Sequence, residues 1–576
     1  MKLAELPFVQ DITACRASEK VDSLPFEFTE DDDLDLCVYY LRTLHNVLLC
    51  SSDVSRAVLA SKYVAFVDKA AHIRGGAEDD EMALQEFFVR VCIKCIIGQS
   101  PLGSTNELSQ RVCQLQRYAL TILHRFLSNR HAVSLSALEL EHILIDNLVK
   151  AIDMADPFVQ VLLLETVYDT LRLRESALHE MQAAAAAASP SSPSPQLSLD
   201  RQPTTTTDNS QMGRSSLTGG EQQSLPQLMP ASLLKCLQAG LSSPNSQTVL
   251  DHWVSFLSEV ISLYSGSIFQ VAIPLVETLC QHIGFTFVAL RTTFSCPGSG
   301  KSLSGTTPES TLIYLLNGLE QVLALAHDQL LSEESHAQMM KGPEQPQSLF
   351  GSMVSGVFQS EGPQSRSATA NDRLTVHLAF QDAMRICYKI WSWGQGEESR
   401  KQDPVSSASF GYTSLRMRNR ARRLMEHLFT AEILECLETI IDIWRSSEAE
   451  SEQTLVFHFL SSLDACRPRH AIPALFNAIY SRTNPSALPP SRKSTLTISL
   501  QDSDLVVFLV EYSRSLDDDA MDEIWPDCMT FLRDLLSNPF PHRQTLPSLV
   551  AFAGILGEKV DNTNFGEQKR MRRDLG

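Results

Sequence analysis

Apolar residues recur along the chain at intervals of three and four residues, the spacing of one face of an α-helix. The clearest stripes lie at 37–48, 161–171, 433–444 and 524–535. Asp156 is placed to cap the second of these helices, and Pro157 suits its first turn. The same spacing predicts further helices near 54–68, 80–98, 106–128, 135–153, 231–241, 247–264, 268–290, 309–332, 371–392, 452–464, 470–481, 504–514 and 546–557.

Strict alternation of apolar and polar residues, the signature of a half-buried strand, is scarce. The best example is Leu496 to Leu500, which is also compatible with a loop. Helix follows helix with short connections, and pairs of helices recur at roughly the 40–47-residue spacing of HEAT or armadillo units. The pattern predicts an all-α fold, an irregular α-solenoid of HEAT/armadillo-like helix pairs with long disordered insertions.

Changes in composition divide the chain. Residues 189–230 are rich in Ser, Pro, Thr and Gln and contain no aromatic residue, so they bury too little surface to offset the entropy of ordering. We therefore predict three helical blocks separated by a disordered linker and an insertion, with short loops inside the last block, which we expect to be truncated at its C-terminus. The blocks are 1–188, 231–340 and 371–576, the disordered segments are 189–230 and 341–370, and the loops are 394–410 and 483–494.

The net charge of the chain disfavours one class of function, general nucleic-acid binding. Among 576 residues, 48 Lys and Arg face 68 Asp and Glu, a net charge of −20. A general nucleic-acid binder needs a basic face that displaces counterions, so this class is disfavoured. No window of 18 uninterrupted apolar residues occurs, and the best candidate, 267–290, is broken by Pro274, Glu277, Gln281 and His282. We predict no transmembrane helix from this pattern.

The cysteines indicate a reducing compartment. There are 13, an odd number, and most lie inside apolar helical patterns, where a free thiol behaves as a small hydrophobe. Cys92 and Cys95 form a CxxC pair, but no second pair or HxxxH supplies the remaining ligands of a zinc site. The segment around them predicts a continuous helix, which favours buried core over a redox or metal site.

Residues 295–302, SCPGSGKS, resemble a phosphate-binding loop. That loop requires GxxxxGKS after a strand, so that its backbone amides surround the phosphates. Here Ser295 replaces the first glycine, Pro297 removes an amide donor, and the preceding pattern is helical. A disordered loop is the favoured interpretation, and nucleotide binding is the alternative.

The sharpest cluster of charge lies in SLRMRNRARRLMEHL. Within it, Arg416, Arg420 and Arg423 share one helix face, and Lys569 to Arg573 form a second basic group. The arginine face could contact anionic lipid or an acidic partner, pair with acidic helices of this chain, or remain solvated. We take Arg416, Arg420 and Arg423 as the candidate site.

Neither a catalytic nor a metal site is predicted. The acidic groups 30–33, 79–81 and 517–519 lie where helices are expected to start, so their charge complements the helix dipole, and none has the ligand spacing of a calcium loop. The HExxH, GxSxG and kinase signatures are absent. The sequence therefore predicts a protein that is not an enzyme and binds no cofactor, metal or small-molecule substrate.

Three stretches resemble the Dopey family of membrane-trafficking proteins, and together they cover a little over a quarter of the chain. They are SLRMRNRARRLMEHLFTAEILECLETIIDIW (414–444), RPRHAIPALFNAIYSRTNP with the segment 500–576, and YSGSIFQVAIPLVETLCQHIGFTFVALR (264–291). The low-complexity inserts suggest a fungal-type member, and the extent of the likeness suggests a middle portion of a much larger protein.

The resemblance implies a process rather than a chemistry. Dopey proteins are large cytosolic helical-repeat proteins bound peripherally to Golgi, trans-Golgi-network and endosome membranes. They act in endosome-to-Golgi and intra-Golgi traffic and associate with a large HEAT-repeat scaffold related to Arf exchange factors, and through it with phospholipid flippases. No catalytic activity is associated with them. The resemblance thus implies a non-enzymatic scaffold.

Two other classes of function remain open. An importin-type soluble transport receptor or adaptor also uses an acidic helical solenoid, in that case to bind basic cargo. An enzyme that uses the Ser295–Ser302 loop is the other possibility. Localisation separates the first from the Dopey interpretation, and nucleotide titration tests the second.

Overall fold

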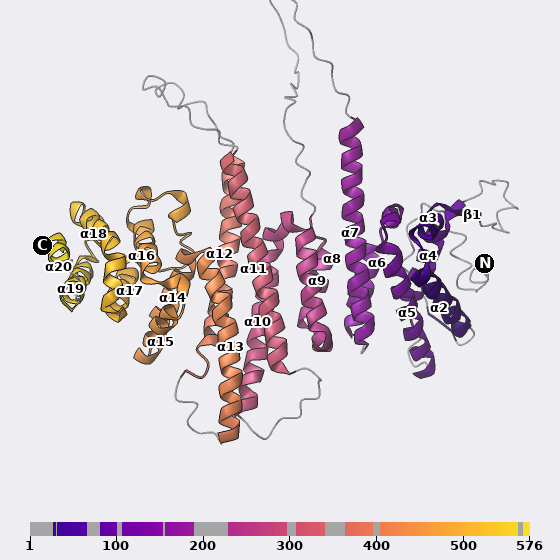
Figure 1. Ribbon diagram of the computed structural model, residues 1–576, viewed down its shortest axis with the longest axis horizontal. Coiled ribbons are helices and arrows are strands. Elements are labelled where there is room, and N and C mark those ends of the chain that lie inside the picture. The colour runs from indigo at the N-terminus through magenta and orange to yellow at the C-terminus, as the bar shows by residue number, and fades with distance from the viewer. Residues whose placement is uncertain are drawn as a thin grey trace, which may run out of the picture. The chain divides into compact units, whose positions relative to one another are not determined.

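The computed structural model describes most of the chain (Figure 1). It divides into two compact units, 1–151 with 158–228, and 152–157 with 229–576. The described residues are 27–29, 32–65, 81–100, 106–153, 156–188, 228–295, 307–339, 363–395, 404–562 and 568–575.

The first unit is mainly helical. Helix α5 packs against both α2 and α4, and α4 also contacts α3. The bounds are α2 Leu34–Cys50, α3 Asp53–Ser61, β1 Tyr63–Ala65, β2 Glu81–Ala83, α4 Leu84–Ile97, α5 Asn106–Leu127, the 3₁₀ helix η4 Arg130–Leu138, α6 Glu141–Asp153 and α7 Pro157–Ala188.

The second unit contains the remaining helices, joined by short 3₁₀ turns and loops. The α-helices are α8 Ala231–Ser242, α9 Leu250–Leu263, α10 Ile268–Ser295, α11 Pro308–Met339, α12 Pro363–Trp391, α13 Pro404–Ala431, α14 Ile433–Ser446, α15 Glu450–Ser461, α16 Pro468–Thr483, α17 Asp502–Ser515, α18 Met521–Ser537, α19 Leu546–Asn562 and α20 Gln568–Leu575. The 3₁₀ turns are η5 Pro244–Val249, η6 Ser265–Ser267, η9 Asp464–Cys466, η10 Pro485–Ala487, η11 Pro490–Arg492, η12 Asp518–Ala520 and η13 Phe540–His542.

Helices in this unit pack against helices close to them in the chain. Helix α10 contacts α11 and α12, α12 contacts α13 and α14, and α14 contacts α16. The succession continues through α16 with α18, α17 with α19, and α19 with α20. Figure 1 shows these helices following one another in chain order across the unit. This is the arrangement of an α-solenoid, and it confirms the predicted all-α fold class.

The predicted apolar stripes are the buried faces. Cys37, Leu41 and Leu48 of α2 are at most 3% exposed. Asp33 caps this helix, accepting a hydrogen bond from the backbone N–H of Leu36 at 2.9 Å. Helix α7 begins at Pro157, where a proline in the first turn was predicted, because the first-turn N–H needs no partner in the helix.

Two short elements differ from the predicted helices. Strands β1 and β2 form an antiparallel pair, with Val64 opposite Met82, where the pattern predicts the end of one helix and the start of the next. The predicted strand 496–500 pairs with no strand among the described residues. It keeps the alternation, since Ile498 and Leu500 are buried, but it lies as an irregular segment against helices.

Helix starts also differ from the predicted segment boundaries. Helix α12 begins at Pro363, inside the predicted insertion 341–370, and α13 begins at Pro404, inside the predicted loop 394–410. Each starts at a proline, whose fixed φ suits the first helical turn. The predicted loop 483–494 contains two 3₁₀ turns, and the predicted linker lies outside the described residues except for its last three, 228–230.

Among the described residues, one helical segment has the length and composition to cross a membrane. It is Ser265–Phe294, with a mean hydropathy of 1.4 over its most apolar window, of which 39% is buried within the protein. It contains the stretch 267–290, the best candidate in the sequence, for which no membrane span was predicted because polar residues interrupt the apolar run. Its buried residues include Leu275, Leu279 and Ile283, and α10 packs against α11 and α12. Such packing is typical of a core helix in a helical protein.

Helices α8 and α9 approach closely because residue 240 is a glycine. Gly240 of α8 lies under the ring of Trp253, which is fully buried in α9. A Cβ atom on residue 240 would lie 2.2 Å from that ring. Gly554 in α19 is the opposite case, because a Cβ there meets nothing within 4 Å.

We predict opposite effects for alanine at these two helical glycines. Gly240→Ala should lower the free energy of unfolding by about 1–3 kcal/mol, because Trp253 must move in a packed core. Gly554→Ala should raise it by about 1 kcal/mol, because alanine is the better helix former. Urea denaturation followed by circular dichroism checks both, and a stabilised Gly240→Ala variant would contradict the described packing.

Candidate functional site

The three arginines of the predicted basic face lie on α13 in different environments. Arg416 pairs with Glu309 of α11, and its side chain is 51% exposed. Arg420 is only 15% exposed and pairs with Glu320 of α11. Arg423 is exposed.

Arg420 is the most deeply engaged of the three. Its Nε donates to Asn317 Oδ1 at 3.0 Å, and an Nη donates to the backbone oxygen of Leu316 at 3.3 Å. His427 also contacts Glu320 from the same face of α13. These contacts join α13 to α11, and pairing with the chain's own acidic helices was one of the alternatives left open by the sequence.

Arg423 makes no ion pair with any residue that the structure describes. It lies one turn beyond Arg420, on an exposed stripe that also contains Asn419 and Tyr412. An external acidic partner or lipid at this face stays a prediction, and Arg423 is the arginine of the three left available for it.

The CxxC pair is part of the core of the first unit. Cys92 and Cys95 of α4 and Cys37 of α2 are all fully buried. Burial raises the pKa of Cys92, and contact with Cys37 together with burial raises that of Cys95. Metal ligation and redox exchange require the thiolate, which these shifts disfavour. No group of three His, Cys, Asp or Glu side chains that could hold a metal ion occurs within the described residues.

The phosphate-loop-like segment and the acidic groups predicted at helix starts have different outcomes in the structure. The phosphate-loop-like segment lies outside the described residues apart from Ser295, the last residue of α10. Asp33 caps a helix as predicted, but Glu81 lies in β2 rather than at a helix start. Asp517 precedes η12 just before α18, and Asp518 pairs with Lys559 at 3.2 Å.

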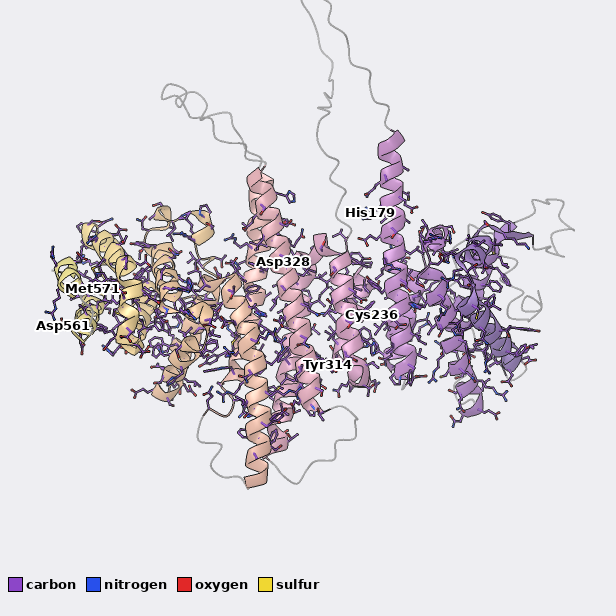
Figure 2. All side chains as sticks on the ribbon, in the orientation of Figure 1. His179, Cys236, Tyr314, Asp328, Asp561 and Met571 are labelled. Atoms are coloured by element: carbon purple, nitrogen blue, oxygen red, sulfur yellow. The ribbon has the colours of Figure 1, made fainter. Side chains whose placement is uncertain are left out.

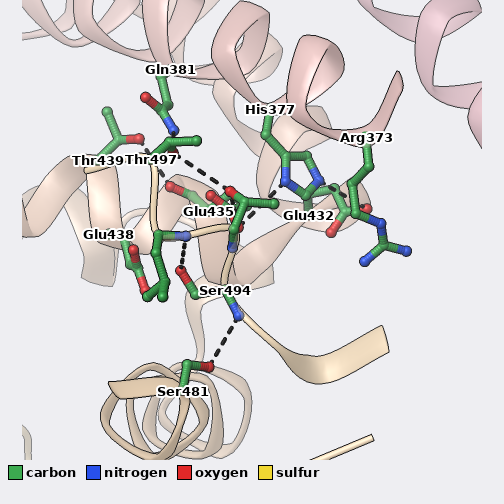
Figure 3. A network of polar contacts seen from close by, with 12 residues as sticks. Arg373, His377, Gln381, Glu432, Glu435, Glu438, Thr439, Ser481, Ser494 and Thr497 are labelled. Atoms are coloured by element: carbon green, nitrogen blue, oxygen red, sulfur yellow. Dashed lines mark hydrogen bonds and ion pairs between the residues drawn. The ribbon is translucent and has the colours of Figure 1, made fainter. Parts of the chain in front are cut away.

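A buried network of charged side chains, which the sequence analysis missed, lies between α12, α14 and the segment 494–497 (Figure 3). His377 of α12 is 1% exposed and lies between two carboxylates. Its Nε2 is 3.6 Å from Glu432 Oε1, and its Nδ1 is 3.3 Å from Glu435 Oε1. Glu435 Oε1 also accepts hydrogen bonds from the backbone N–H and the hydroxyl of Thr495, at 2.8 and 2.9 Å.

These contacts fix the charge state of the network. Burial alone lowers the pKa of His377, but the two carboxylates outweigh it and raise the pKa to about 9. Burial alone raises the pKa of Glu432, but His327 and His377 outweigh it and lower the pKa to about 2. At neutral pH the histidine is therefore a buried cation between two anions.

A second buried pair extends the network. Glu438, on α14, is fully buried and binds Arg482 of α16 through both carboxylate oxygens, at 2.8 and 2.9 Å. Arg482 Nε also donates to the backbone oxygen of Leu500 at 2.8 Å. One planar guanidinium thus holds both α14 and the segment that precedes α17.

The chemistry of this network is structural. Its members do not line either of the two hollows described below. Burial of charge without partners is costly, and here each charge has an opposite partner. The signal available in the sequence was the spacing of Glu432, Glu435 and Glu438 within an otherwise apolar helix, because three- and four-residue spacing places such carboxylates near one face.

Two hollows occur on the described surface of the second unit. One, of about 450 Å³, is an open depression between α10 and α12 lined by both signs of charge, including Glu277, Asp382, Arg385 and Lys389. Burial raises the pKa of Cys280 beside them, so this thiol is a poor nucleophile. The other, about 140 Å³, lies between α18 and α19 and is mainly apolar.

The chain is similar in sequence to a known protein family. Residues 508–576 match the family model described as DOP1 C-terminal. The chain is 43% identical to Protein dop1 of Emericella nidulans over 550 residues, which is 95% of this chain and 29% of that protein. The chain belongs to the Dopey family. It is also 28% identical to Protein DOP1 of Saccharomyces cerevisiae over 354 residues, which is 59% of this chain and 20% of that protein.

The Dopey chain thus spans less than a third of the length of either relative. The likeness recognised from three stretches extends over nearly the whole chain in the Emericella relative, and its assignment to a middle portion stays a prediction.

Solved structures of the karyopherin Kap121p are also similar to the chain. The complex with Nup53p covers 93% of this chain and 47% of Kap121p, with 11% identity and a TM-score of 0.21. The complex with the SUMO protease Ulp1p gives the same identity and TM-score. Similarity at this level carries no argument about cargo, and the solenoid assignment rests on the packing of the chain's own helices.

We predict that His377→Gln lowers the free energy of unfolding by roughly 3–5 kcal/mol at pH 6, because two buried carboxylates lose their counter-charge. The histidine pKa is raised in the fold, so its contribution is complete below the unfolded value of 6.5 and is lost as pH rises through about 9. The glutamate pKa is lowered, so its contribution is complete above 4.5 and is lost as pH falls through about 2.

Chemical denaturation at pH 6 and pH 10 measures this effect. The difference between wild type and His377→Gln should be large at pH 6 and should shrink at pH 10, where the wild-type histidine is neutral. His179→Gln is the matched control, because His179 is 73% exposed on α7 (Figure 2). Equal effects of the two substitutions would show that the network does not stabilise the fold.

Proposed function

We propose that the chain is part of a non-enzymatic scaffold in endosome-to-Golgi and Golgi vesicle-mediated protein transport. It acts in the cytosol, peripherally on trans-Golgi-network and endosome membranes. It binds a large HEAT-repeat scaffold related to Arf exchange factors, and through it phospholipid flippases. The observation that carries the proposal is the 43% identity to a Dop1 protein over 95% of the chain.

The structure supports a binding role through its architecture. Stacked helices in the second unit bury one face against their neighbours and leave an outer face available for partners. Buried charged side chains form ion pairs within the fold, as His377 does with Glu435 and Arg482 with Glu438. The buried thiols Cys92 and Cys280 have raised pKa values, which disfavours a thiolate nucleophile.

Affinity purification of the full-length protein that contains this chain tests the proposal. We expect an Arf-exchange-factor-like HEAT scaffold to co-purify, and a fluorescent fusion to label Golgi and endosome membranes. Nuclear-envelope labelling, with basic cargo recovered instead, would favour the importin-type receptor that the net charge of −20 also allows.

We predict that any contact of the arginine face with anionic membrane depends on Arg423. Flotation with phosphatidylserine-containing liposomes should show weaker binding for Arg423→Glu than for wild type, because one exposed cation near anionic lipid contributes about 1 kcal/mol. Reversal at Arg416 or Arg420 is a poorer test, since it places like charge beside Glu309 or Glu320.

Arg42→Glu is the control for this measurement, because Arg42, on α2, is likewise exposed and forms no ion pair with a residue that the structure describes. Unchanged flotation of Arg423→Glu would remove lipid contact at this face from the proposal and leave the scaffold role to partner binding.

A further inference from the structure

The apolar hollow between α18 and α19 continues onto an exposed apolar surface. Its floor and walls are Met529, Leu532, Leu535 and Leu536 of α18 and Leu546, Leu549, Val550 and Ala553 of α19. Leu536 is 70% exposed and Val550 is 64% exposed. Phe540, in the turn between the two helices, is 86% exposed. We call this hollow, with Phe540, the α18–α19 groove.

The shape of the α18–α19 groove favours an extended apolar occupant. The hollow itself, about 140 Å³, has room for one large apolar side chain. On each helix an exposed residue lies one turn from a more buried one, Leu536 from Leu532 on α18 and Val550 from Leu546 on α19. Two parallel apolar rows with a central hollow are the surface that an amphipathic helix covers with residues at i, i+3, i+4 and i+7.

Three exposed arginines lie in or close in sequence to the α18–α19 groove. Arg533 lines the hollow, Arg543 lies between Phe540 and the start of α19, and Arg573 is on α20 beside the lining residue Asp574. All three arginines are exposed, and none forms an ion pair with a residue that the structure describes. The chain as a whole has a net charge of −20, and the lining of the hollow itself contains one acidic residue, Asp574.

Two neighbouring arginines of α20 differ in their contacts. Its Met571 is buried and holds the helix against its neighbours, while Arg572 pairs with Asp561 of α19 at 2.8 Å (Figure 2 labels Met571 and Asp561). Arg573, the next residue, has no such partner among the described residues. An occupant of the groove with carboxylates on its flanks would supply counter-charges for Arg573 and Arg533.

We propose that the α18–α19 groove binds an amphipathic helix of a partner protein, whose apolar face carries leucine or phenylalanine and whose flanks carry glutamate or aspartate. The apolar face fills the hollow and covers Leu536, Phe540 and Val550. The flanking carboxylates pair with Arg533, Arg543 and Arg573. The inference deepens the scaffold function and rests on it only in taking the chain to bind partner proteins.

Two synthetic helical peptides serve as probes for this site. Both carry the same leucine face, one has glutamate on its flanks and the other has lysine, and each is labelled with fluorescein. Fluorescence anisotropy is measured with the purified chain of 576 residues. We expect the glutamate peptide to bind at least about tenfold more tightly than the lysine peptide, with an advantage that falls as salt is added.

Four variants locate the binding. Leu536→Asp with Val550→Asp should weaken binding of the glutamate peptide by about tenfold or more, because both side chains are at the centre of the contact. Val288→Asp, at an exposed apolar residue of α10, should leave it unchanged. Arg533→Glu with Arg573→Glu should reverse the preference between the two peptides, and Arg42→Glu, on α2, should not.

The outcomes that overturn the proposal are distinct. Equal binding of both peptides, or binding insensitive to the Leu536 and Val550 substitutions, shows that the groove is not the site of an acidic helix. Self-association that Leu536→Asp abolishes, without peptide binding, shows that the occupant is a second copy. Neither outcome alters which proteins co-purify with the full-length protein or where it localises, so failure here is separable from failure of the trafficking role.

Discussion

Burial of apolar helix faces against helices close by in the chain is the interaction on which the larger unit depends. Each fully buried leucine, isoleucine or phenylalanine contributes about 1.5–3 kcal/mol, and side chains such as Leu279, Phe380 and Leu475 lose essentially all contact with water. Because these contacts join helices near in sequence, stability is distributed along the stack. A local defect, such as a methyl group pressed against Trp253, therefore acts first on its own helix pair.

The buried charges around α14 determine how the neighbouring elements align. A purely apolar joint between α12, α14 and the segment before α17 would tolerate more than one register. His377 between Glu432 and Glu435 requires one alignment, since an offset would leave buried charge uncompensated. The irregular segment 494–500 pairs with no strand among the described residues. Hydrogen bonds to these side chains hold it in place instead.

The arginines discussed above fall into two groups according to their contacts within the fold. Arg416 and Arg420 are used to join α13 to α11, whereas Arg423, Arg533 and Arg573 are exposed and form no ion pair with a residue that the structure describes. On a strongly acidic chain, such positions distinguish one outer surface from another. A scaffold needs this distinction, because helical repeats otherwise present similar polar faces.

The sequence by itself determined the helices, their buried stripes and the solenoid class, because spacing of three and four residues fixes which face is apolar whatever that face packs against. It placed Cys92 in the core and Pro157 at a helix start for the same local reason. Only the tertiary structure decided which charges pair, since Arg420 and Glu320, or Arg482 and Glu438, are far apart in the chain. The α18–α19 groove likewise arises from the packing of two helices, so neither helix alone encodes it.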